Sequence, residues 1–142
     1  MKVRDIMTRN IASVNPLATV AEAARLMEEY NVGSIPVCDK NGLIGIVTDR
    51  DIVMRNVARG KNPENTSIKE VMSAGVTTVT PDTEIAEVAK VMGNKRIRRL
   101  PVVENNKLVG MLALGDVAVH ARRDMEIAGM LAIIFKTNKY ED

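Results

Sequence analysis

The sequence predicts an α+β fold made of two similar halves, each a small sheet with helices packed on it. Short apolar, β-branched runs bounded by turn residues alternate with amphipathic stretches of helical period. The pattern also repeats: a shift of 65 residues lays Val3–Val53 on Ile68–Ala118 without a gap, with 13 of 51 positions identical. Neither half can seal a core alone, so we expect the halves to pack about a pseudo-two-fold axis.

Each half is expected to follow the order β-α-β-β-α after a short lead-in. In the first half, the lead-in is Val3–Met7 and the first helix opens with a capping box at Thr19 and Glu22. The five elements are expected at residues 11–14, 19–30, 35–38, 43–47 and 51–59. Their counterparts are expected at residues 77–79, 85–95, 100–103, 108–112 and from 116 onwards.

These elements predict four segments along the chain. They are a first repeat over residues 1–60, a linker over 61–67, a second repeat over 68–121 and a C-terminal helical tail over 122–142. The tail is apolar nearly all round between Met125 and Phe135. Because a surface helix has no reason to be so apolar, we expect it to be buried against its own domain or against a second subunit. We favour a homodimer.

Composition argues against several classes of protein. A formal net charge of +2 does not by itself indicate a nucleic-acid or membrane partner. Cys38 is the only cysteine and His120 the only histidine, so we expect no intrachain disulfide, no metal site and little scope for general base catalysis. No apolar stretch approaches the roughly 20 residues that span a bilayer. We expect a cytoplasmic protein without membrane contact.

The segment Gly45–Asp51 carries the main candidate site. Thr48 ends an apolar strand, and Asp51 lies in the first turn of the following helix. Thr-x-x-Asp is a capping box, in which the two side chains satisfy free N–H groups of the helix. The same pair could hold a sugar, since a carboxylate accepts hydrogen bonds from two adjacent hydroxyls. The segment alone leaves both interpretations open.

Taken together, the motifs resemble a tandem CBS-domain pair, or Bateman module, over about Val3 to His120. The resemblance rests on the Met that ends each lead-in, on Ile35-Pro36-Val37 and Leu100-Pro101-Val102, and on the Gly-apolar-apolar-Thr-x-x-Asp pattern. It is closest in kind to small stand-alone bacterial and archaeal members. The resemblance implies a regulatory module that binds AMP, ADP, ATP or S-adenosylmethionine between the repeats, often as a disc-shaped dimer.

The resemblance also implies roles for individual residues. Thr48 and Asp51 would contact the ribose hydroxyls, and Arg98 or Arg99 of Arg-Arg-Leu-Pro would contact phosphate across the pseudo-dyad. The base pocket would be lined by Val14, Asn15, Ile35 and Pro36. The second repeat departs from the pattern, because Ala113 replaces Thr48 although Asp116 remains. We therefore expect two unequal sites.

The interpretation is a regulatory sensor of an adenine nucleotide, with AMP as the first choice, that signals to an unidentified protein. We find no nucleophile–base pair, metal-ligand cluster or Walker-type loop, so we expect neither enzyme activity nor a catalytic cofactor. One alternative is a ligand-free interaction module in which Thr48 and Asp51 only cap a helix. Another is nucleic-acid binding through Lys95–Arg99, although those cations could equally stabilise a helix C-terminus.

Overall fold

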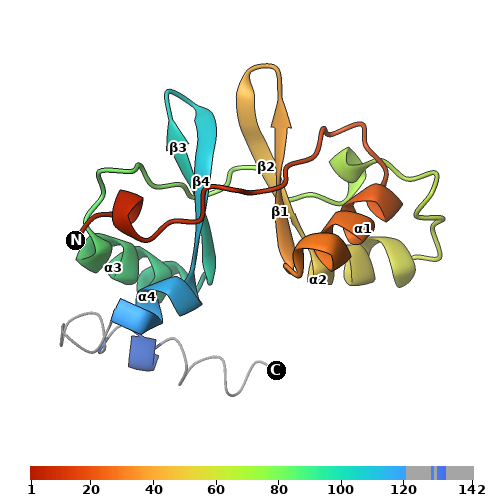
Figure 1. Ribbon diagram of the computed structural model, residues 1–142. Coiled ribbons are helices and arrows are strands. Elements are labelled where there is room, and N and C mark those ends of the chain that lie inside the picture. Colours follow the sequence, from red (N-terminus) through yellow and green to blue (C-terminus); the bar gives the residue numbers. More distant parts are fainter. Residues whose placement is uncertain (121–128, 130, 134–142) are drawn as a thin grey trace. The chain divides into compact units, whose positions relative to one another are not determined.

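The computed structural model describes residues 1–120, 129 and 131–133 (Figure 1). Its helices are η1 (Val3–Asp5), α1 (Val20–Tyr30), α2 (Asp49–Ile52), η2 (Val53–Val57), η3 (Ile68–Glu70), α3 (Ile85–Lys95) and α4 (Leu114–His120). Its strands are β1 (Ser34–Asp39), β2 (Gly42–Thr48), β3 (Arg99–Glu104) and β4 (Lys107–Ala113). Two small sheets combined with helices confirm the α+β class.

The chain forms two compact units. The β1–β2 unit contains residues 10–76 and 105–108, and the β3–β4 unit contains residues 1–9, 77–104 and the chain from 109 onwards. The units do not coincide with the two sequence repeats, because each repeat's lead-in packs with the hairpin of the other repeat. Val3 lies in the core of the β3–β4 unit, and Ile68 lies in the core of the β1–β2 unit.

In the β1–β2 unit, a hairpin is flanked on both sides by short backbone pairings. β1 pairs antiparallel with β2, and Val14 joins β1 because its N–H donates to the carbonyl of Pro36 (3.0 Å). On the other side, Ile46 and Ser73 exchange two backbone hydrogen bonds of 3.0 and 2.9 Å. The lead-in of the second repeat thus adds one pairing to the hairpin of the first.

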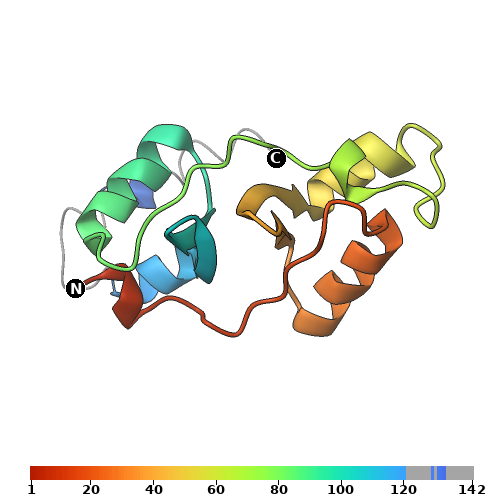
Figure 2. The ribbon, with the colours of Figure 1, turned by 90° about the horizontal axis from the view of Figure 1, so that it is seen from above.

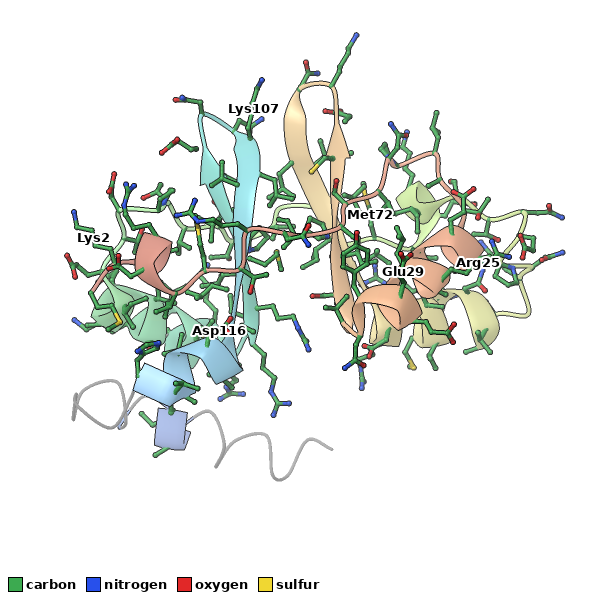
Figure 3. The ribbon with its side chains drawn as sticks, in the orientation of Figure 1. Lys2, Arg25, Glu29, Met72, Lys107 and Asp116 are labelled. Atoms are coloured by element: carbon green, nitrogen blue, oxygen red, sulfur yellow. The ribbon has the colours of Figure 1, made fainter. Side chains whose placement is uncertain are left out.

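Gly45 allows this close approach. A Cβ atom there would lie 2.8 Å from the Ser73 carbonyl oxygen and 2.9 Å from the sulfur of Met72, whose side chain is marked in Figure 3. Arg55 holds the same lead-in from the other end, since its Nη1 donates to the carbonyls of Val71 (3.0 Å) and Met72 (3.1 Å).

The β3–β4 unit repeats this arrangement with residues 65 positions away. The N–H of Val79 donates to the carbonyl of Pro101 (3.1 Å), and Thr8 exchanges two 2.9 Å hydrogen bonds with Met111. Gly110 corresponds to Gly45, and a Cβ atom there would lie 2.8 Å from the sulfur of Met7. In each unit, both helices lie on the same side of the hairpin (Figure 2).

In each unit, apolar side chains from the hairpin, from the helices and from the lead-in of the other repeat form one core. In the β1–β2 unit, fully buried members come from all three sources: Ile35, Val37, Val47, Val20, Ala23, Ile68 and Val71. α1 begins as predicted, because the hydroxyl of Thr19 accepts from the N–H of Glu22 (3.1 Å) and the Glu22 carboxylate accepts from the N–H of Thr19 (3.1 Å). α3 has the predicted bounds, Ile85–Lys95.

Two sequence predictions need correction. The strands expected at residues 11–14 and 77–79 are single pairings, Val14 with Val37 and Val79 with Val102, because only one residue of each segment meets the hairpin. The helix expected at residues 51–59 begins at Asp49 and continues as a π-helix over η2. Its wide turn is visible in the hydrogen bond from the N–H of Ala58 to the carbonyl of Val53 (2.8 Å).

The tail prediction lies largely outside the described residues. Within the part that is described, Leu131 is 6% exposed and belongs to the core of the β3–β4 unit, whereas Ile133 is 53% exposed. Among the described residues, no helix combines the length and the apolar character needed to cross a bilayer.

Candidate functional site

Thr48 and Asp51 form a reciprocal capping box at the point where β2 runs into α2. The hydroxyl of Thr48 accepts a hydrogen bond from the N–H of Asp51 (3.0 Å). Oδ2 of Asp51 accepts from the N–H of Thr48 (2.9 Å). Both side chains are half-buried. The geometry therefore contains the helix cap that the spacing predicts.

The cap leaves hydrogen-bonding capacity on both residues. The Thr48 hydroxyl is used as an acceptor, so its own proton is free to be donated. Asp51 uses Oδ2, and no described residue donates to its Oδ1. One hydroxyl donor beside one carboxylate acceptor suits a ligand that carries two adjacent hydroxyls. Capping and ligand binding are thus compatible in the same pair.

The four residues assigned to the base pocket belong to the same unit as Thr48 and Asp51. Ile35 is fully buried, and Val14 is 7% exposed, so both side chains are part of the hydrophobic core. Pro36 is also buried, and its carbonyl accepts from the N–H of Val14. Asn15 is exposed, and its Oδ1 accepts from the N–H of Leu17 (2.9 Å). Three of the four side chains are therefore buried within the β1–β2 unit, and Asn15 is exposed.

The equivalent position in the β3–β4 unit keeps only half of the box. Oδ2 of Asp116 accepts from the N–H of Ala113 (2.8 Å), but Ala113 has no hydroxyl to complete the pair. Figure 3 marks Asp116 at the foot of the hairpin, where β4 runs into α4. The two caps therefore differ in chemistry as the sequence predicts, with hydroxyl and carboxylate at one and a carboxylate alone at the other.

Arg98 and Arg99 are both exposed and belong to the β3–β4 unit, at the start of β3. The carbonyl of Arg98 accepts from the N–H of Leu114 (2.7 Å), which places the pair beside the start of α4. Arg96 just before them has φ of 55°, a left-handed conformation that Asn31 adopts in the first repeat at φ of 54°. The structure thus places these cations in one unit and Thr48 with Asp51 in the other.

Sequence reasoning missed Ser34, which faces Thr48 across the hairpin. Ser34 and Thr48 are opposite partners in the β1–β2 register, and Ser34 is 6% exposed. A count back from the Lys40-Asn41 turn, across which Asp39 pairs with Gly42, would place Val47 opposite Ser34, since paired residues in a hairpin are equidistant from its turn. The bulge between Val37 and Cys38 shifts that count by one residue, and the sequence gives no sign of it.

Two further observations concern candidate metal ligands and the Cys38 thiol in the described part of the chain. No group of three or more His, Cys, Asp or Glu side chains is placed there to hold a metal ion. Partial burial, reinforced by the nearby Asp39, raises the pKa of the Cys38 thiol. A raised pKa keeps the thiol protonated and poorly nucleophilic at neutral pH.

Comparison with known proteins gives a consistent picture. The family model described as "CBS domain" matches residues 3–57 and again residues 68–122. The CBS domain-containing protein YhcV of Bacillus subtilis is 40% identical over 136 residues, which cover 96% of each chain.

Two similar solved structures contain ligands. The crystal structure of CBSX2 in complex with AMP has a TM-score of 0.75 and 28% identity, covering 86% of this chain and 96% of that one. The CBS domain pair of protein MJ0100, in complex with 5-methylthioadenosine and S-adenosyl-L-methionine, has a TM-score of 0.77 and 26% identity, covering 86% of this chain and 97% of that one.

Proposed function

The chain belongs to the CBS-domain family and holds two CBS domains, and on that premise we propose that it is a regulatory module sensing an adenosine-containing ligand. AMP is our first choice, with ADP, ATP and S-adenosylmethionine as alternatives. The observation that carries the proposal is the Thr48–Asp51 pair, which keeps a free hydroxyl proton and a free carboxylate oxygen beyond the needs of the helix cap. Similar CBS-pair structures with AMP or S-adenosyl-L-methionine support this ligand class.

In the proposed complex, the ribose diol donates to the carboxylate of Asp51 and accepts from the hydroxyl of Thr48. The base lies near the backbone around Val14, Asn15, Ile35 and Pro36. Arg98 or Arg99 contacts the phosphate, a role that suits a guanidinium because it is always charged and binds oxyanions with two donors. Asp116, without a neighbouring hydroxyl, forms a weaker second site.

Regulation follows if the ligand binds one arrangement of the two units more tightly than another, because a ligand without such a difference shifts no equilibrium. We propose that a homodimer in the cytoplasm reports this shift to a partner protein. We propose no reaction, because no chemistry beyond binding is needed at the Thr48–Asp51 pair.

Calorimetric titration of AMP, ADP, ATP and S-adenosylmethionine into the wild-type protein tests the proposal. We expect about one ligand per chain, with binding lost in Asp51→Ala. Asp116→Ala is the matched control, because it removes the same backbone contact from the other cap but leaves the Thr48–Asp51 pair intact. Failure of well-folded wild-type protein to bind any of the four ligands would contradict the proposal.

A second candidate function, that of a protein-interaction module, is favoured by a separate observation. Three apolar side chains of η2 are turned to solvent, with exposures of 53% at Val53, 52% at Met54 and 62% at Val57. Neighbouring exposed apolar residues are typical of contact surfaces. If the protein is an interaction module that binds no ligand, Asp51→Ala lowers the free energy of unfolding by about 1 kcal/mol through the lost cap and changes no ligand affinity.

A further inference from the structure

Ser34 occupies a position from which it can reach a ligand held by Thr48 and Asp51. Ser34 begins β1 and Thr48 ends β2, and the two are directly opposite in the antiparallel register. Side chains of opposite residues lie on the same face of a hairpin, with Cβ atoms about 5 Å apart. The carbonyl of Gly33, just before Ser34, accepts from the N–H of Asp49 (2.9 Å), which holds this strand end against the start of α2.

The hydroxyl of Ser34 is almost enclosed and yet unused. The residue is only 6% exposed, and none of the described residues is hydrogen-bonded to its hydroxyl. Its oxygen is not among the fully sealed polar atoms without a partner, which in the described chain are those of Asn56 alone. The hydroxyl therefore retains an opening. A hydroxyl that is open on one side and has no partner among the described residues is available to a ligand, because it both donates and accepts hydrogen bonds.

The other unit replaces both members of this cross-strand pair. β3 begins at Arg99 and β4 ends at Ala113, which are 65 residues beyond Ser34 and Thr48. The flanking hydrogen bond from Leu114 to the carbonyl of Arg98 (2.7 Å) repeats the one from Asp49 to Gly33, so the register is the same. Arg99 thus stands opposite Ala113. Two hydroxyls in one unit are replaced by a long cation and a methyl group in the other.

We infer that Ser34 is a ligand-contacting and specificity-determining residue of the Thr48–Asp51 site. Its hydroxyl adds a third polar group for the sugar, and its small size leaves room for that sugar. Arg99 and Ala113 remove both features from the β3–β4 unit, so that unit binds the same uncharged diol more weakly. This inference rests on the proposed function, because it concerns the same site.

Calorimetry with adenosine tests the inference, because adenosine carries the diol but no phosphate for an arginine to contact. Ser34→Ala is expected to weaken adenosine binding about two- to tenfold, the worth of one hydrogen bond. Ser34→Arg, which installs the residue of the other unit, is expected to weaken it at least tenfold. Ser34→Cys, which keeps the side-chain size, replaces Ser34→Ala if the alanine variant has a lower melting temperature.

The reciprocal change is expected to create a site. Arg99→Ser combined with Ala113→Thr should raise the stoichiometry for adenosine from about one to about two per chain. Arg99→Ser alone is the control and should leave it at one, because the hydroxyl of residue 113 is still missing. If wild type binds AMP but not adenosine, Ser34→Ala is compared with wild type using AMP.

The outcomes separate the two claims. If wild type binds and Asp51→Ala does not, but Ser34→Ala binds within twofold of wild type, the inference about Ser34 is wrong and the proposed function stands. If wild-type protein binds neither adenosine nor any of AMP, ADP, ATP and S-adenosylmethionine, both are wrong.

Discussion

Single residues decide how closely the chain can approach itself. Gly45 is the clearest example, because its hydrogen atom faces the carbonyl oxygen of Ser73 and the sulfur of Met72 at distances that no Cβ atom tolerates. Gly110 has the same role opposite Met7. The 65-residue repeat shows that these two glycines are equivalent in the sequence. Why glycine is required at both positions becomes clear only in the structure, where each lead-in packs against the hairpin of the other repeat.

Gly45→Ala is expected to destabilise the protein by about 1–3 kcal/mol, because the Ser73 backbone must move to admit the methyl group. Gly115→Ala is the matched control. Nothing lies within 4 Å of a Cβ atom at Gly115, which is in α4, so this change should leave stability equal or raise it by up to about 1 kcal/mol. Chemical denaturation of both variants measures the difference. Equal stability of the two would contradict the close-approach account.

At the scale of elements, predictions based on local chemistry agree with the structure, and those that depend on tertiary contacts do not. The capping boxes at Thr19 and Thr48 are formed, because side chains within one turn determine them. α3 also has its predicted ends, although no side chain caps its start. The π-helical turn in η2 was missed. It buries Asn56 completely, and nothing in the spacing of apolar residues indicates that an amide faces the core.

The two caps offer a reciprocal test on α2 and α4. Thr48→Ala is expected to lower the free energy of unfolding by about 1 kcal/mol, because the N–H of Asp51 loses its acceptor. Ala113→Thr is expected to raise it by about 0.5–1 kcal/mol, because Asp116 already holds its half of the box. Thermal or urea unfolding of the two variants provides the measurement. A stabilising Thr48→Ala would show that the cap geometry is not as described.

For the whole molecule, the sequence predicts two repeats, but the compact units are built differently. Val3 and Met7 complete the unit of the second hairpin, while Ile68 and Val71 complete that of the first. The apolar character of the lead-ins shows that they are buried without showing where, because both hairpins offer equivalent surfaces. Ser34 was missed for a related reason. Its importance depends on the cross-strand partner, which a bulge displaces by one residue.

The central claim is that the Thr48–Asp51 pair holds an adenine nucleotide. Backbone amide NMR of the labelled protein during titration with AMP tests it at residue level. We expect the largest shift changes at Ser34, Thr48 and Asp51, with smaller changes at Ala113 and Asp116, and we expect them to vanish in Asp51→Ala. No saturable change at Thr48 and Asp51, or equal changes at both caps, would contradict the account.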